Sequence, residues 1–185
     1  MTSVPDTLPW GHPLTAQEYL ALDTPDDGRR YELLDGVLVV TPSPQVQHQR
    51  VVLAMSTALA HACPADLEVF GSPLDVRLSE RTVVQPDVLV VRGADATGPR
   101  LTGVPLLVVE VLSDSTRGHD LVIKRERYAE AGVPSYWVVE PVSAELAVLE
   151  LGADGYEESG RHRLRDVVVL LTRPFDVRLD LRARV

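Results

Sequence analysis

Apolar residues recur along this chain with two different periods, and each period predicts a different kind of element. From residue 46 to residue 62 they follow one another at spacings of three and four, which predicts an amphipathic helix with His48 in its apolar stripe. Short runs rich in Val and Leu predict buried strands instead, and two of these runs are VVQPDVLVV and PLLVVEVL. Each of the two carries a single carboxylate, Asp87 in the first and Glu110 in the second.

Capping and turn residues mark the elements of the first third of the chain. The capping box formed by Thr15 and Glu18 predicts a short helix from about Ala16 to Leu22. The Asp35-Gly36 pair inside RYELLDGVLVV predicts a β-hairpin over residues 30–40, because this pair favours the tight turn that joins antiparallel strands.

The rest of the chain predicts mainly strands. One strand is expected over residues 67–78, bent at Gly71-Ser72-Pro73, and another at VPSYWVVEP. Between the Glu110 run and VPSYWVVEP we expect a helix over residues 118–131, capped within SDST and ended by Gly132. Near the carboxyl end the pattern predicts a strand over 145–151, a turn over 152–160 and short strands around 167–171 and 175–181.

The resulting order is helix, three strands, helix, strand, with a hairpin before it and strands after it. A strand, a helix and a second strand in succession predict two parallel neighbours, so the fold class is α/β with a mixed, α+β type of sheet. With no internal repeat and no linker in the sequence, we expect one domain over residues 1–185, in which residues 1–13 form a loosely ordered segment.

Composition restricts the classes of function. The chain is 45% hydrophobic and 24% charged, as in ordinary globular proteins, and its apolar runs are too short to span a bilayer. We expect a cytoplasmic protein with no membrane partner, in agreement with a lone cysteine, Cys63. A formal net charge of −9 argues against a protein that simply coats nucleic acid, but a nuclease whose acidic cluster is offset by a metal ion is compatible with it.

The two carboxylates in apolar runs are the first candidates for chemistry. If their strands pair as an antiparallel hairpin, Asp87 and Glu110 come to lie near each other at one end of a sheet. Mg²⁺ prefers hard oxygen ligands and needs few carboxylates, so the pair predicts a metal site that activates water at a phosphodiester. On the following helix, Lys124 lies with Leu121, Tyr128 and Ala131 on the packed side, from which its amine can reach the two acids.

Several motifs in the same order resemble a known family. The segments RYELLDGVLVV, PSPQVQHQR, QPDVLVV and LLVVEVLSDSTRGHDLVIKRERYAEAGVPSYWVVEP are similar to those of the bacterial Uma family of restriction-endonuclease-like proteins, in the PD-(D/E)xK nuclease superfamily. The resemblance extends from about Leu14 to the last strand. It implies a restriction-endonuclease-like core, a Mg²⁺ cofactor that Mn²⁺ can replace, and DNA as substrate.

The resemblance also implies roles for individual residues. Asp87, Glu110 and the main-chain carbonyl of Val111 are the implied metal ligands. Leu112 stands where the superfamily usually has its lysine, and Lys124 resembles the lysine that this family presents on the next helix instead.

Three further positions match those of the family. Glu32 in YELLDG is an implied catalytic acid, and His48 and Gln85 are expected to line the site.

Simpler interpretations remain open for each residue. Asp87 and Glu110 also fit structural charges neutralised by arginines, and Lys124 fits a solvated helix face. Glu32 fits an exposed hairpin position, and His48 fits a hydrogen-bonded core histidine.

Three hypotheses of function follow. The first is a Mg²⁺-dependent endonuclease that cuts DNA, either alone or as a homodimer. The second is a binding or regulatory module that keeps the nuclease fold without cutting, and the third is a phosphodiesterase acting on RNA or on a small phosphodiester.

Overall fold

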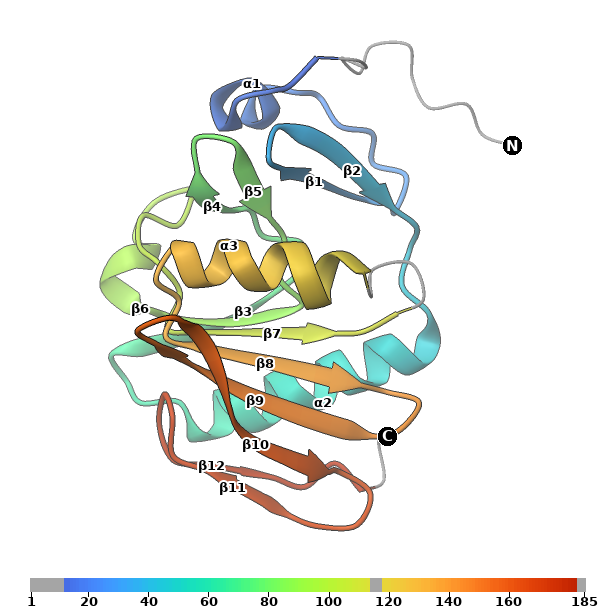
Figure 1. The fold of residues 1–185 in the computed structure, drawn as a ribbon, viewed down its shortest axis with the longest axis vertical. Coiled ribbons are helices and arrows are strands. Elements are labelled where there is room, and N and C mark those ends of the chain that lie inside the picture. The colour runs from blue at the N-terminus through green and yellow to red at the C-terminus, as the bar shows by residue number, and fades with distance from the viewer. Residues whose placement is uncertain (1–11, 114–117, 183–185) are drawn as a thin grey trace.

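A six-stranded mixed sheet lies at the centre of the computed structural model, which describes residues 12–113 and 118–182 (Figure 1). Its strands run in the order β10-β9-β8-β7-β6-β3, and a second sheet has the order β2-β1-β5-β4. The strands are β1 (Arg30–Leu34), β2 (Val37–Thr41), β3 (Leu67–Gly71), β4 (Val76–Ser79), β5 (Thr82–Val84), β6 (Val88–Arg92), β7 (Leu107–Val111), β8 (Ser135–Glu140), β9 (Glu145–Gly152), β10 (Gly155–Arg163), β11 (Val169–Leu171) and β12 (Val177–Leu179). The helices are α1 (Ala16–Leu20), α2 (Val46–Ala62), the 3₁₀ helix η1 (Gly93–Ala96), the π-helix η2 (His119–Lys124) and α3 (Arg125–Glu130).

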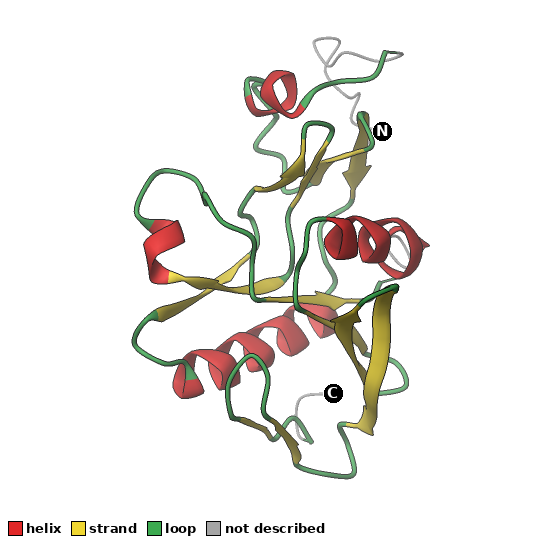
Figure 2. Ribbon diagram, turned by 60° about the vertical axis from the view of Figure 1, so that its left-hand side comes forward, coloured by secondary structure: helices red, strands yellow, loops and turns green. Residues whose placement is uncertain are grey.

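Helices cover both faces of the central sheet. Figure 2 shows α2 beneath the sheet and η2 with α3 above it. Alternate residues of each strand divide between the two faces, as the pleat requires: Val109 and Val111 pack toward α2, whereas Val108 and Leu112 pack toward α3. β7 and β8 are parallel neighbours joined through η2 and α3, and the other pairs in this sheet are antiparallel. The predicted mixed sheet and helix order are therefore confirmed.

The small sheet is built on the predicted hairpin. Asp35 and Gly36 have φ angles of 53° and 84°, so both adopt the left-handed conformation that a two-residue hairpin turn demands. β1 also pairs with β5 through Leu33 and Val83, both fully buried. The predicted capping box is present at the amino-terminal end of α1, and α1 packs on this sheet. The hairpin and first helix are confirmed, although the helix ends two residues earlier than expected.

Two predicted strands are each divided in the structure. The segment 67–78 forms β3 in the central sheet and β4 in the small one, with the chain leaving the first sheet at Ser72-Pro73. VVQPDVLVV likewise forms β5 and β6, separated by Gln85, Pro86 and Asp87. Since proline cannot donate a ladder hydrogen bond, both breaks fall where a proline interrupts the run. The prediction of Asp87 within a strand is wrong, because Asp87 immediately precedes one.

The predicted turn over residues 152–160 is also wrong. β9 and β10 are joined by Ala153 and Asp154, and β10 already begins at Gly155. β10 lies at the edge of the sheet and most of its residues are exposed, so it lacks the apolar alternation that would have marked it as a strand. The short strands predicted near 170 and 178 are confirmed as β11 and β12.

The second predicted helix has an unexpected first half. Residues 119–124 form a π-helix before α3 continues the element to Glu130, and Gly132 ends it with a φ of 82°. A π-helix bonds residue i to residue i+5, so it shifts the side chains away from the faces of a regular α-helix. Lys124 is buried as predicted. Leu121 is 40% exposed, so the prediction that it lies on the packed side together with Lys124 is wrong. Most of the capping segment SDST lies outside the described residues, as do residues 1–11 of the predicted loose terminus.

No helix in the described part of the chain combines the length and the apolar character needed to cross a membrane.

Candidate active site

Asp87 and Glu110 lie next to each other on the α3 face of the central sheet. β6 pairs antiparallel with β7, and Val88 is opposite Val109. Continuing that register by one residue places Asp87 opposite Glu110. In agreement, the main-chain nitrogen of Val111 donates to Asp87 Oδ2 at 2.8 Å. Both carboxylates are only 1% exposed, and burial of two neighbouring acids requires compensating charge.

Lys124 supplies part of that charge. Its Nζ lies 3.2 Å from Glu110 Oε1 and 2.9 Å from Glu32 Oε1, and its side chain is 1% exposed. The hydroxyl of Tyr128, one helical turn further on, donates to the same Glu110 oxygen at 2.7 Å. Side chains of the η2–α3 helix therefore contact one acid from each sheet, Glu32 from the small sheet and Glu110 from the central one.

Arg30 and His48 hold the two oxygens of Asp87. Arg30 Nη2 lies 2.6 Å from Oδ1, and His48 Nε2 lies 3.1 Å from Oδ2. Burial alone raises the pKa of Asp87, but the hydrogen bond from His48 and the positive charge of Arg30 outweigh burial and lower that pKa to about 2. Asp87 is therefore ionised at neutral pH, which is the form that binds a cation.

The pKa of Arg30 moves in the opposite direction. Desolvation lowers it, but the nearby charges of Asp87, Glu110 and Glu32 have the larger combined effect and raise the pKa of Arg30 above its ordinary value. All three acids of the cluster thus affect the pKa of Arg30, although its hydrogen bond is with Asp87.

Glu32 and Gln85 connect the site to the small sheet. Glu32 is 2% exposed, so the simpler interpretation of an exposed hairpin position is wrong. Its Oε1 accepts a hydrogen bond from the main-chain nitrogen of Gln85 at 2.7 Å. The side-chain amide of Gln85 donates instead to Asp75, 3.0 Å away, so Gln85 contacts the acid cluster through its main chain.

The structure also decides between the interpretations left open for Lys124 and His48. Lys124 does not belong to a solvated face. His48 is 7% exposed and bonds to Asp87 through Nε2, while its buried Nδ1 has no hydrogen-bond partner among the residues that the structure describes. His48 thus combines the two interpretations, as a core histidine that faces the site.

Arg30 and the hydroxyl of Tyr128 are the two site groups that the sequence did not reveal. Arg30 stands two residues before Glu32 on one strand, and residues at this spacing share a face, so the period of two was the available signal. A second unused signal concerns Lys124. It is the chain's single lysine, since the other 17 of the 18 basic residues are arginines, and this one lysine is fully buried among acids.

The chemistry of this cluster fits a divalent cation. Three buried carboxylates, of Asp87, Glu110 and Glu32, contact the basic side chains of Arg30 and Lys124, so acids outnumber these two bases in the cluster. Mg²⁺ takes hard oxygen ligands and retains several waters, so two carboxylates and a main-chain oxygen suffice. Among the described residues, no three His, Cys, Asp or Glu side chains are arranged to hold a metal ion by themselves.

Fold and site together define the class of protein. The succession α2, β3, β6, β7, α3 and β8 around a mixed sheet, with acids where β6 begins and in β7, is a restriction-endonuclease-like arrangement. A solved structure, described as a putative nuclease belonging to DUF820 from Anabaena variabilis, has the same fold with a TM-score of 0.76. It is 16% identical and covers 93% of this chain and 99% of its own.

The chain belongs to the Uma2 family, whose description is "Putative restriction endonuclease" and whose sequence model matches residues 16–182. Among individual relatives, the uncharacterized protein slr1290 of Synechocystis sp. is 27% identical over 164 residues, which cover 83% of this chain and 86% of that protein.

Proposed function

We propose that this chain is a Mg²⁺-dependent endonuclease that hydrolyses phosphodiester bonds of DNA. The observation that carries the proposal is the juxtaposition of Asp87 and Glu110, both buried and opposite each other, with the only lysine of the chain against Glu110. Membership in a family of restriction-endonuclease-like proteins supports the same conclusion.

In this proposal the metal is held by Asp87, Glu110 and the main-chain carbonyl of Val111. When bound, Mg²⁺ supplies an activated water and neutralises charge on the phosphate. Mn²⁺ has similar ligand preferences and is expected to replace it.

The protein's own groups position the reactants. Lys124, whose amine contacts Glu110 and Glu32 in a buried site, orients the attacking water or stabilises negative charge that develops on the phosphate. Glu32 also contacts the Lys124 amine, and the hydroxyl of Tyr128 donates to the Glu110 carboxylate and helps to fix it in place. Arg30 and His48 keep Asp87 ionised.

Plasmid cleavage tests the proposal. Supercoiled DNA is incubated with Mg²⁺ and either wild type, Asp87→Asn, Glu110→Gln or Lys124→Met. We expect wild type to nick or linearise the plasmid and the three variants to lose at least about 100-fold in rate, as removal of one group that stabilises charge in a transition state commonly does. EDTA should abolish the wild-type activity.

Matched controls exclude contamination and general damage. Asp66→Asn and Glu126→Gln make the same chemical changes at exposed positions, the second on the α3 element itself, and should cut like wild type. Equal cutting by all proteins, including Asp87→Asn, would refute the assignment of the site.

One observation favours a second candidate, the binding or regulatory module that does not cut. Asp87 is already bound by Arg30 and His48, and Glu110 by Lys124 and Tyr128, so the cluster has substantial charge compensation from the protein itself. Calorimetric titration with Mg²⁺ and Mn²⁺ separates the two candidates. The nuclease should bind metal in a manner that Asp87→Asn abolishes, whereas the module should give no heat that depends on Asp87.

A further inference from the structure

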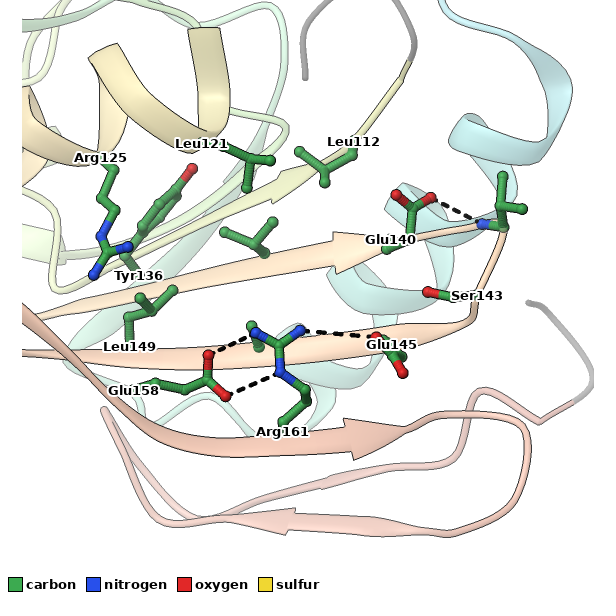
Figure 3. Close-up of a pocket in the computed structure, with 13 residues that line it drawn as sticks. Leu112, Leu121, Arg125, Tyr136, Glu140, Ser143, Glu145, Leu149, Glu158 and Arg161 are labelled. Atoms are coloured by element: carbon green, nitrogen blue, oxygen red, sulfur yellow. Dashed lines mark hydrogen bonds and ion pairs between the residues drawn. The ribbon is translucent and has the colours of Figure 1, made fainter. Parts of the chain in front are cut away.

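A cavity of about 680 Å³ opens between η2, α3 and the strands β8 to β10, on the same face of the sheet as the acid cluster (Figure 3). Its volume lies within the range of small-ligand pockets, about 300–1,000 Å³. None of the residues that carry the proposed chemistry lines it, so the cavity is a separate site with its own lining.

The cavity adjoins the candidate active site through consecutive positions of the fold. Leu112 in its wall follows Glu110 by two residues, and Val138 in its floor is the partner of Glu110 in the parallel pairing of β7 and β8. Arg125 in its roof comes directly after Lys124. A molecule held here therefore lies beside the proposed catalytic acid.

The floor of the cavity, formed by the sheet, is apolar. Val138, Ala147 and Leu149 come from two paired strands of the sheet, and the Tyr136 ring is at the same end of the cavity as Arg125 (Figure 3). Leu121, 40% exposed, presents its side chain from above. An apolar space between a sheet face and a helix can hold a planar group against both surfaces.

The rim of the cavity is polar and has an excess of negative charge. Glu140, Glu145 and Glu158 face two arginines, Arg125 and Arg161. Arg161 is held by Glu158 at 2.6 Å and lies 3.7 Å from Glu145, so most of its charge is already compensated (Figure 3). Arg125 donates to the main-chain oxygen of Tyr156 at 2.9 Å. Arg161 donates to both oxygens of Glu158, but a carboxylate oxygen can accept more than one hydrogen bond, so the rim carboxylates can also accept from amino groups of a ligand.

We propose that the cavity is a nucleobase pocket, which receives one base displaced from the strand that is cut and prefers bases with an exocyclic amino group over thymine. This inference rests on the proposed nuclease function, since it is the substrate's base that would be held. Enzymes that act on nucleic acid capture displaced bases between apolar surfaces and read the polar edge, and a carboxylate accepts from the amino group of cytosine in the same way.

Free nucleosides test the pocket without any cleavage. Protein labelled with ¹⁵N is titrated with deoxycytidine, thymidine and inorganic phosphate, and backbone amide shifts are followed by NMR. We expect saturable shifts within residues 136–149 and 155–161 on adding deoxycytidine, about tenfold weaker binding of thymidine, and no binding of phosphate there, because a site built to accept a hydrogen bond discriminates against a ligand without the donor. Equal affinity for the two nucleosides, or phosphate binding alone, would overturn the proposal.

Neighbouring glutamates on β10 provide a matched pair of variants. Glu158 lines the cavity, whereas Glu157 does not. Both are exposed, so either substitution leaves the core intact. Glu158→Gln should weaken deoxycytidine binding about tenfold and Glu157→Gln should leave it unchanged. Ala147→Phe, which fills the floor, should abolish binding, and Glu158→Gln keeps the test decisive if that larger change prevents folding.

A fluorescent base tests displacement from the strand. A duplex that contains 2-aminopurine is mixed with wild type in EDTA, so that binding is observed without cutting. Capture of the base outside the stack should raise its fluorescence several-fold, and binding with unchanged fluorescence would refute the proposal. A plasmid cut by a protein that binds no nucleoside would refute the pocket alone, whereas nucleoside binding without metal-dependent cutting would refute the nuclease function.

Discussion

Lys124 is the residue on which the electrostatics of the site depend. A buried cation is tolerated only where acids compensate it, and Lys124 lies within 3.2 Å of Glu110 and 2.9 Å of Glu32. Conversely, burial of Glu110 and Glu32 is tolerated in part because Lys124 compensates their charge. Removal of one partner therefore leaves uncompensated charge in a site almost without solvent.

We predict that Lys124→Met lowers the free energy of unfolding by about 3–5 kcal/mol, the usual consequence of breaking a buried ion pair on one side. Urea unfolding followed by circular dichroism measures the change. Combining Lys124→Met with Glu32→Gln should recover part of the loss, with a coupling energy of about 1–3 kcal/mol in the double-mutant cycle. Strictly additive losses would show that the two side chains do not interact.

The single lysine also allows metal binding to be observed directly. Protein labelled with ¹³C-lysine gives one side-chain signal, from Lys124. We predict that Mg²⁺ shifts this signal in wild type, since a divalent ion between Asp87 and Glu110 changes the field at the neighbouring amine. Asp87→Asn should leave the signal in place over the same titration, and Asp66→Asn should behave like wild type. A wild-type signal that ignores Mg²⁺ would contradict the metal site.

The acids and the lysine were predictable from the sequence, but most of their partners were not. A charged residue in a Val-rich run is conspicuous, and so is a lysine on a packed helix face. Arg30, in contrast, is 57 positions away from Asp87, and the strand period that places it on the face of Glu32 does not say which acid it contacts. Partner identity over such separations is a property of the tertiary fold.

Among the elements, the helix after β7 differs most clearly from what the sequence pattern predicts. Its existence and its end at Gly132 follow from the sequence, whereas its opening π-helical segment does not, because an i to i+5 turn leaves no periodic signature. The division of two predicted strands at Pro73 and Pro86, in contrast, could have been predicted from the sequence. The prolines were visible, and their inability to donate to a ladder predicts a break at both positions.

An ion pair links this helix to the hairpin turn. Arg127 Nε and Nη2 donate to the two oxygens of Asp35 at 2.7 and 2.9 Å. These hydrogen bonds lower the pKa of Asp35, with the positive charge of Arg127 acting in the same direction. A depressed pKa in the folded state means that the pair stabilises the protein above the unfolded pKa, and that the contribution is lost as the pH falls through the folded pKa.

We therefore predict that Asp35→Asn costs about 0.5 kcal/mol at pH 7, a small value because the carboxylate is half exposed, and that the difference disappears once the pH has fallen below the lowered pKa. Asparagine tolerates the positive φ of this turn, so the backbone is unaffected. Thermal unfolding of both proteins from pH 7 down to pH 2 measures the effect. In an Arg127→Gln background the same substitution should make no difference.

For the molecule as a whole, the important feature is that the site lies where two sheets meet. Arg30 and Glu32 belong to the small sheet, Glu110 belongs to the central one, and Asp87 stands on the segment that passes between them. The small sheet has its own core, which includes Leu33, so its packing determines how two of the charged groups, Arg30 and Glu32, are positioned.

This arrangement predicts different outcomes for two similar core substitutions. Leu33→Ala in the small sheet and Leu59→Ala in α2 both remove fully buried side chains and should each cost about 2–5 kcal/mol. Leu33→Ala should also weaken Mg²⁺ binding at temperatures where the protein is still folded, because the small sheet positions Glu32 and Arg30, whereas Leu59→Ala should not. Hydrogen exchange with a parallel metal titration distinguishes the two, and equal loss of metal affinity would contradict the prediction.

The distribution of these groups along the chain, from Arg30 to Tyr128, has a consequence for the living cell. The ribosome must have released residues 30–128 before the charged cluster can assemble, so a shorter nascent chain lacks part of the cluster. The nuclease activity proposed above should therefore be absent from fragments that end before residue 128 and should arise only once the chain has folded.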